Sequence, residues 1–345
     1  MEFKQLAKLK KGDNVAILSP SFAAPAVWPQ VYELGIKRLT EKFGLVPVEY
    51  PATKKLDATK EERAKDLIDA FSDDNIKAVI ATIGGNDQVT YIKNLPAEPF
   101  VNNPKPFFGF SDNTHFVNFL WQNGIPSYYG GSIFTQYAMQ QKMDEMTVEY
   151  LDRALFNKGW YELKSSEYYV DVGLDWNDPA TLNLSRKRED NIGWIWDGEK
   201  NAEGITWGGC LESIDEMLRH GINIPALEQF SNIVLFTETS EEMPSPEYVF
   251  KVYRALGERG ILGKVRGVLV GRPKSWYFSE QKTAEEMKSY QEEQREAILR
   301  VVRMYNKDIP VILNLDFGHT DPQIPLPCGK SVKIDSVSKK IFIEF

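Results

Sequence analysis

Short apolar runs alternate with amphipathic segments along the first half of the chain. The runs are apolar at nearly every position, which is typical of strands buried on both faces of a parallel sheet. Between them, apolar residues recur at helical spacing. The predicted strands span residues 14–19, 46–50, 78–83, 106–110 and 126–129, and the predicted helices span residues 31–43, 60–71 and a segment that ends near Trp121. This order predicts an α/β fold in which helices cover a parallel sheet.

The second half of the chain has a similar pattern after a change in composition near residue 165. Residues 171–204 are polar, charged and rich in tryptophan, and a loop of this length is usually functional or disordered. Beyond it we predict strands at 233–236, 265–270 and 311–315, a helix at 284–305 and a closing hairpin of 332–335 with 340–345. We therefore predict an N-terminal α/β domain over 1–165, a linker and tryptophan-bearing loop over 166–204, and a C-terminal α/β domain over 205–345.

Composition excludes several functional classes. Hydrophobic residues make up 42% of the 345 residues and charged residues 26%, which suits a globular protein with a full core. A formal net charge of −8 argues against a nucleic-acid partner, because phosphate binding needs a basic surface. We predict no signal peptide and no membrane-spanning helix, since no long apolar segment occurs. With only Cys210 and Cys328, a reducing, cytoplasmic location is expected.

Missing motifs narrow the chemistry further. No G-x-G-x-x-G opens a helix, and neither a Walker lysine motif nor H-E-x-x-H occurs, so we expect no cofactor. The chain has only three histidines, which makes a histidine-rich metal site improbable. His115 is expected to have a surface or packing role, and His220 complements the dipole at the end of a helix. His319 lies in a proline-rich loop after an apolar run, where a catalytic and a structural role are equally compatible with the composition.

The stretch Gly109-Phe110-Ser111-Asp112-Asn113 lies between an apolar run and a predicted helix. It nearly matches the nucleophile elbow G-x-S-x-G, a tight strand-to-helix turn that exposes a serine hydroxyl. Asn113 replaces the final glycine, and asparagine tolerates unusual backbone angles. In such a turn the amide of Asp112 can point at an oxyanion. The alternative is that Ser111 or Asp112 caps the helix, which this stretch alone favours.

A catalytic serine needs a base, which is usually oriented by an acid. The candidate base is His319. The candidate acid is Glu238, just past an apolar run, although it is also one carboxylate of an acidic loop that contains Glu241 and Glu242. An oxyanion hole needs backbone amides on an unobstructed turn. The turn IGGND at 83–87 can supply them, because it also follows a predicted strand.

Five segments together resemble the LD-carboxypeptidase family of serine peptidases. They occur in the family's order, and the resemblance extends from about residue 10 to the end of the chain. The segments are IGGND at 83–87, GFSDNT at 109–114, TWGGCLE at 206–212, LFTE at 235–238 and GHTDPQIPLPCG at 318–329. The resemblance implies a flavodoxin-like N-terminal domain, a C-terminal domain of mixed sheet and helices, a site between them, a homodimer and no metal.

The same resemblance implies roles for individual residues. Ser111 would be the nucleophile, His319 the general base and acid, and Glu238 the carboxylate that holds the imidazole. The amides of Gly85 and Asp112 would form the oxyanion hole.

Within the family, two branches differ at the first glycine turn. The murein-processing branch resembles R-G-G-Y-G, whereas this chain has Ile83-Gly-Gly-Asn-Asp. GGND, GGCLE and the tryptophan-bearing loop resemble the microcin C immunity peptidase branch, which cleaves the amide between an aspartyl group and a nucleotide-like moiety. That branch implies a small peptide or peptide–nucleotide substrate, contacted by Gly84 and Asn86. A tryptophan would stack on the base, and Trp194 and Trp196 are the candidates, with packing of the loop as the alternative role.

Three other functions remain as alternatives. The nearest is a murein tetrapeptide LD-carboxypeptidase with the same chemistry. A more distant one is a non-catalytic protein whose two domains close on a small ligand. The most distant is a glycosidase that uses Asp112 and Glu238 as a carboxylate pair, which leaves His319 and the glycine turn without a role.

Overall fold

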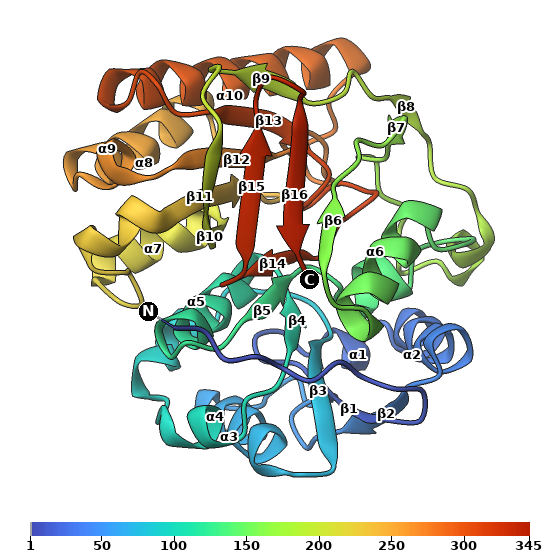
Figure 1. The fold of residues 1–345 in the computed structure, drawn as a ribbon. Coiled ribbons are helices and arrows are strands. Elements are labelled where there is room, and N and C mark those ends of the chain that lie inside the picture. Colours follow the sequence, from blue (N-terminus) through green and yellow to red (C-terminus); the bar gives the residue numbers. More distant parts are fainter. Residues whose placement is uncertain (1) are drawn as a thin grey trace.

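The computed structural model describes residues 2–345 (Figure 1). Met1, the first residue of the predicted N-terminal domain, lies outside the described residues. A six-stranded sheet fills the lower half of Figure 1 and an eight-stranded sheet the upper half. The predicted α/β fold is confirmed.

The six-stranded sheet has the order β14-β5-β4-β3-β1-β2. Its first five strands in the chain are all parallel, and their order, 2-1-3-4-5, is that of flavodoxin-like folds. The strands are β1 (Asn14–Leu18), β2 (Val46–Glu49), β3 (Ile76–Ala81), β4 (Phe107–Gly109), β5 (Ser127–Tyr129) and the antiparallel β14 (Leu326–Cys328). The near-continuous apolar pattern of β1 and β3 is explained by burial on both faces.

The eight-stranded sheet has the order β6-β16-β15-β10-β11-β12-β13-β9. Its centre, from β10 to β13, is parallel, and its outer strands pair antiparallel. The strands are β6 (Trp160–Glu162), β9 (Ile195–Asp197), β10 (Ala202–Cys210), β11 (Ile233–Glu238), β12 (Gly267–Gly271), β13 (Val311–Leu315), β15 (Ser331–Asp335) and β16 (Lys340–Glu344). A separate two-stranded sheet joins β7 (Tyr168–Tyr169) to β8 (Glu189–Asp190).

The two large sheets exchange strands. β14 follows all but the last two strands in the chain, yet it pairs with β5 of the six-stranded sheet. β6 lies before residue 165, yet it pairs with β16 of the eight-stranded sheet. One continuous hydrophobic core therefore contains residues of both sheets, such as Phe108 and Trp207.

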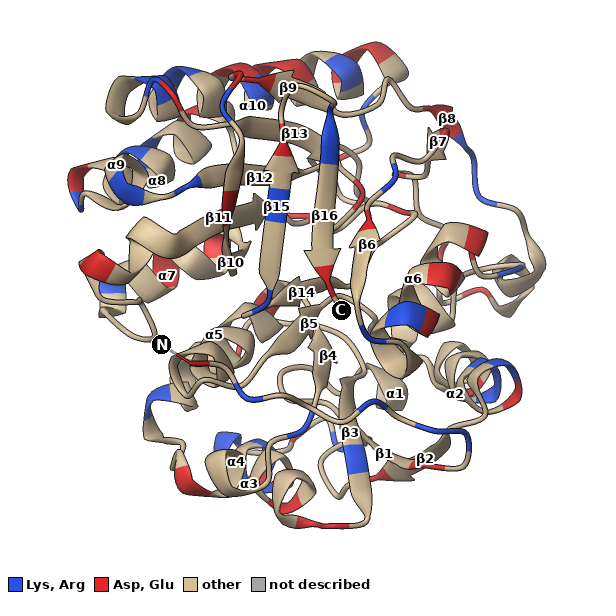
Figure 2. Cartoon of the chain, viewed as in Figure 1, with Lys and Arg blue, Asp and Glu red and all other residues tan. Residues whose placement is uncertain are grey.

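Helices pack against both sheets. They are α1 (Ala24–Val27), α2 (Pro29–Phe43), α3 (Lys60–Ser72), α4 (Glu98–Asn102), α5 (Thr114–Gln122), α6 (Glu145–Phe156), α7 (Leu211–His220), α8 (Pro246–Glu258), α9 (Ile261–Lys264) and α10 (Ala284–Tyr305). Short helical turns are η1 (Gln88–Thr90), η2 (Ile92–Asn94), η3 (Ser111–Asn113), η4 (Ile133–Tyr137), η5 (Pro179–Asn183) and η6 (Leu227–Asn232). In Figure 2 acidic and basic residues both recur along α10, whose apolar side faces the core. Within residues 2–345, none of the helices has the length and apolarity needed to cross a membrane.

The carboxyl ends of the two parallel regions meet at α5. This helix follows β4 and packs against β10, where the Thr114 hydroxyl accepts a hydrogen bond from the Cys210 amide at 2.9 Å. The Asn118 side chain also donates to the carbonyl of Gly208 at 3.0 Å. Ligand sites in parallel sheets lie at the carboxyl ends of the strands, so a site is expected at this junction.

Candidate active site

Ser111 stands on a strained turn between β4 and α5. Its φ of 63° is in the left-handed region, which costs a residue other than glycine about 1–2 kcal/mol. Two hydrogen bonds hold the backbone there: the Ser111 amide donates to the hydroxyl of Tyr129 at 3.1 Å, and its carbonyl accepts from Thr114 at 2.6 Å. The helix α5 begins at Thr114 without a side-chain cap, so the capping role considered for Ser111 and Asp112 is not what the structure shows.

The glycine turn at 83–87 packs directly against Ser111. A Cβ atom on Gly84 would lie 2.7 Å from the Ser111 Cβ and 2.9 Å from its Oγ, so only glycine leaves room here. The Asp112 carboxylate accepts hydrogen bonds from the amides of Asp87 and Gln88, both at 3.0 Å. The residue that follows the serine therefore fixes the shape of the turn beside it.

Three of the predicted oxyanion and substrate positions, Gly84, Gly85 and Asn86, lie on this same turn. Gly85 has a φ of 146°, and a Cβ there would collide with the hydroxyl of Ser21. Among residues 2–345, the Gly85 amide donates no hydrogen bond, which leaves it available. The side chain of Asn86 is exposed next to it.

Glu238 and His319 form a close pair at the carboxyl ends of strands of the eight-stranded sheet. Glu238 ends β11, and His319 lies in the loop after β13. The buried Oε2 of Glu238 lies 2.6 Å from Nδ1 of His319. Gly318 has a φ of 98°, and a Cβ there would lie 2.5 Å from the same Oε2. The residue before His319 is thus small enough for the carboxylate to reach the ring.

The imidazole lies beside the serine turn but makes no hydrogen bond to the serine. Its ring packs edge-on against Phe110, the residue before Ser111, with ring centres 4.9 Å apart. Nε2 faces the carboxylate of Glu241 at 3.2 Å. Within residues 2–345, Ser111 Oγ forms no hydrogen bond with His319.

Acidic neighbours determine the charge of this imidazole. Burial on its own would lower the pKa of His319, but the charges of Glu238, Glu241 and Glu212 outweigh it and raise that pKa to about 9. The ring is therefore positively charged at neutral pH in the absence of a ligand.

Tyr129 connects the serine turn to the acid. Its hydroxyl accepts from the Ser111 amide and donates to Glu238 Oε1 at 2.6 Å. Complete burial raises the pKa of this phenol well above its usual range, so the hydroxyl keeps its proton. Tyr129 was not predicted as a site residue, although its position at the carboxyl end of a predicted strand was a usable signal.

Comparison with known families identifies the family of this chain. Residues 15–130 match the LD-carboxypeptidase N-terminal domain, and residues 203–334 match the LD-carboxypeptidase C-terminal domain. The chain belongs to the LD-carboxypeptidase family. The predicted family resemblance is therefore confirmed, and with it a peptidase class for this protein.

Solved structures similar to this protein include one with a bound nucleotide. An MccF-like protein from Streptococcus pneumoniae, solved in complex with AMP, is 28% identical with a TM-score of 0.85, covering 96% of this chain and 98% of that chain. An MccF-like protein from Bacillus anthracis is 26% identical with the same TM-score, covering 98% of each chain. The microcin C7 self-immunity protein MccF of Escherichia coli is 24% identical over 98% of this chain and 94% of its own length.

Among residues 2–345, neither Trp194 nor Trp196 has an interaction with the turn that contains Ser111. Trp194 donates from its indole to Asp316 at 2.9 Å. Trp196 lies on β9, where it pairs with Ile312, and the Lys339 ammonium is 5.3 Å from its ring centre. In Figure 1, β9 is at the upper edge of the eight-stranded sheet, away from β4. A substrate contact for either tryptophan stays a prediction.

The other two histidines have structural contacts. His115 is buried, as the packing alternative expected, and its Nε2 lies 3.1 Å from Glu216 and 3.6 Å from Asp112. These three side chains also form a small group of potential metal ligands. His220 is in the last turn of α7.

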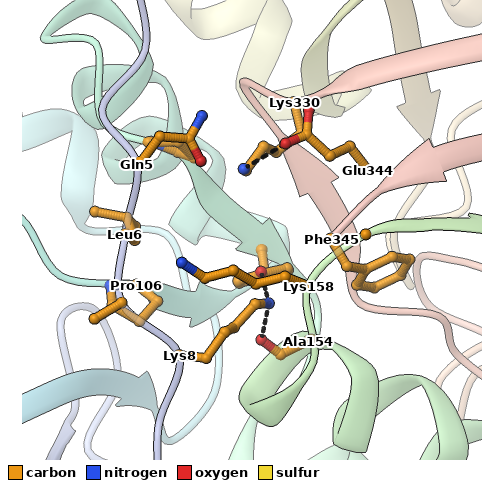
Figure 3. A pocket seen from close by; sticks show the side chains of 13 residues that line it. Gln5, Leu6, Lys8, Pro106, Ala154, Lys158, Lys330, Glu344 and Phe345 are labelled. Atoms are coloured by element: carbon orange, nitrogen blue, oxygen red, sulfur yellow. Dashed lines mark hydrogen bonds and ion pairs between the residues drawn. The ribbon is translucent and has the colours of Figure 1, made fainter.

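A separate pocket lies away from the turn that contains Ser111. Figure 3 shows this cavity of about 50 Å³, bordered by Lys8, Lys158 and Lys330. Lys8 donates to the Tyr128 hydroxyl and to the carbonyl of Ala154, both at 2.7 Å, so protein atoms already satisfy its ammonium. None of the residues that line this pocket belongs to the candidate active site.

Proposed function

We propose that this protein is a serine peptidase that hydrolyses an amide bond in a small peptide or a peptide–nucleotide conjugate. Ser111 is the proposed nucleophile, His319 the general base and acid, and Glu238 the carboxylate that orients the imidazole. The observation that carries the proposal is the Glu238–His319 pair packed beside the strained turn of Ser111. A non-catalytic binding protein would have no need of that strain.

In the proposed mechanism, Ser111 Oγ attacks the amide carbonyl carbon while His319 Nε2 takes its proton. The carbonyl oxygen becomes an oxyanion that accepts hydrogen bonds from the amides of Gly85 and Asp112. The C–N bond then breaks as Nε2 returns the proton to the leaving nitrogen. A water molecule, deprotonated by the same imidazole, releases the acyl group from Ser111.

This mechanism requires Nε2 to exchange its contact with Glu241 for one with the Ser111 hydroxyl when substrate binds. Glu238 holds Nδ1 at 2.6 Å, so the ring keeps its orientation while its other nitrogen exchanges partners. The buried Tyr129 hydroxyl supports both ends of the site, since it contacts the Ser111 amide and Glu238.

A peptide–nucleotide substrate is favoured by the relatives. The Streptococcus pneumoniae protein, similar over nearly its whole length, is described in complex with AMP. The glycine turn of this chain also lacks the sequence of the murein-processing branch. A murein peptide is the second candidate, because a Bacillus subtilis relative 24% identical to this chain carries the name of a murein peptide carboxypeptidase.

The two substrate classes can be separated with purified protein. We expect hydrolysis of aspartyl sulfamoyl adenosine to aspartate and sulfamoyl adenosine, measured by chromatography, with Ser111→Ala as the blank. A murein tetrapeptide, tested in parallel, should be cleaved at least about tenfold less efficiently. Preferential release of the terminal D-residue from the tetrapeptide would instead assign the protein to murein processing.

The pH dependence of this hydrolysis should reflect the acidic surroundings of His319. A general base must be neutral, and the pKa of His319 is raised to about 9. We therefore expect kcat/KM to rise with pH through neutrality and to level off only above about pH 9. Far-UV circular dichroism over the same range controls for unfolding. A rise that is complete near pH 7 would contradict the charge assigned to this ring.

A further inference from the structure

Glu241 occupies the nitrogen of His319 that the reaction needs. Its Oε2 lies 3.2 Å from Nε2, while Nδ1 is already paired with Glu238. The side chain of Glu241 is 43% exposed, whereas that of Glu238 is fully buried. One carboxylate therefore supports the ring from the protein interior, and the other approaches it from the solvent side.

A hydrogen-bonded turn places Glu241 at this position. Glu212, on the first turn of α7, accepts hydrogen bonds from the Ser240 amide at 2.9 Å and the Ser240 hydroxyl at 2.8 Å. The amide of Met243 donates back to the Ser240 carbonyl at 3.1 Å, and Met243 has a φ of 46°. The residue directly before Glu241 is thus anchored, and the turn closes directly after Glu242.

The three charged side chains with the largest effect on the imidazole are carboxylates. They are Glu238 at the end of β11, Glu241 on the following turn and Glu212 on α7. Glu238 is committed to Nδ1 and Tyr129, and one oxygen of Glu212 is committed to Ser240. Glu241 alone of these three is open to a ligand. A carboxylate in this position attracts a cationic group and repels an anionic one.

We propose that Glu241 selects substrates whose acyl residue carries a free α-ammonium group, that is, aminoacyl amides rather than N-acylated ones. This inference rests on the proposed function and names the substrate class of the same site. The α-nitrogen is two bonds from the scissile carbonyl carbon, about 2.5 Å away. When that carbon is about 3–3.5 Å from Ser111 Oγ, the ammonium falls within reach of a carboxylate that contacts the attacking base.

The same contact couples recognition to activation. A substrate ammonium that donates to Glu241 replaces His319 Nε2 as the partner of this carboxylate. The imidazole nitrogen is then free to accept the proton of Ser111. An N-acetylated substrate has no charge at this position and leaves Glu241 on the imidazole.

The test compares two substrates in three proteins. Aspartyl sulfamoyl adenosine and its N-acetyl derivative differ only at the α-nitrogen. The unsubstituted protein should prefer the free amine by about 10- to 100-fold in kcat/KM, the factor expected for a charge-assisted hydrogen bond. Glu241→Gln should reduce this preference to within about threefold. Glu242→Gln is the matched control, because Glu242 is exposed and makes no contact with His319 among residues 2–345, and it should keep the preference.

Binding provides a readout that does not depend on turnover. Calorimetry with Ser111→Ala should show tighter binding of the free amine than of the N-acetyl derivative, and adding Glu241→Gln should remove the difference. Equal hydrolysis of both compounds by the unsubstituted protein, or an unchanged preference in Glu241→Gln, would overturn the inference while leaving the serine mechanism intact. A binding preference without any hydrolysis would support the ammonium site and count against the proposed function.

Discussion

Replacing Ser111 with alanine is expected to lower amide hydrolysis by about 10⁴- to 10⁶-fold, because the substrate then has no nucleophile to attack it. The fold should remain, since Ser111 Oγ forms no hydrogen bond within residues 2–345 and the turn is held through backbone atoms. Alanine has the same backbone strain as serine at a φ of 63°, so the free energy of unfolding should change by less than about 1 kcal/mol.

A second serine, which follows the neighbouring strand of the same sheet, provides the control for this substitution. Ser132 follows β5, is buried, and its hydroxyl has no hydrogen-bond partner. Ser132→Ala should therefore retain activity within a few-fold while removing a comparable oxygen atom. If Ser111→Ala hydrolysed the substrate at a rate close to that of Ser132→Ala, Ser111 would not be the nucleophile.

The second large effect is expected for stability rather than activity. Gly208 lies opposite Phe236 in the pairing of β10 with β11, and its φ is 154°. A Cβ at this position would overlap the carbonyl oxygen of Phe236, which is backbone and cannot move aside. We expect Gly208→Ala to lower the free energy of unfolding in urea by about 3–5 kcal/mol, through clash and backbone strain together.

Gly159 separates these two causes. It has a φ of 125°, but a Cβ there would meet no atom within 4 Å. Gly159→Ala should therefore cost only the backbone strain, about 1–2 kcal/mol. Equal destabilisation by the two substitutions would mean that the close approach of β10 and β11 contributes nothing.

The sequence predicted two kinds of element well: strands buried on both faces, and helices whose ends are set by neighbouring residues in the chain. The strands around residues 14–18 and 76–81 are buried on both faces, so their pattern needs no knowledge of the neighbours. The helix predicted at 284–305 matches α10 at both ends, and Thr283 and Glu286 form a capping box at its start.

Elements that depend on distant partners were not predicted. β14 includes Pro327, which disfavours a strand, and it is tolerated because this strand lies at the edge of its sheet. β10 contains Gly208 and Gly209, which weaken strand propensity, although the strand is central. In both cases the pairing comes from the rest of the fold.

The candidate site divides in the same way. Ser111, Glu238 and His319 could be proposed from the sequence because each follows an apolar run, and ligand sites in parallel sheets lie at the carboxyl ends of the strands. The contact of Glu241 with His319 was not accessible, since it depends on the turn that Glu212 anchors. In the sequence Glu241 is one acidic residue in a run of them.

The exchange of strands between the sheets has a consequence for biosynthesis. The edge of the sheet that bears Ser111 is covered only when residues 326–328 have joined β5. Glu238 and His319 also come from the later part of the chain. A ribosome that has released only the first half of this protein has therefore produced a serine without its base, on a sheet with an open edge. The nascent chain should be unable to hydrolyse amides in the cell until almost all of it has emerged.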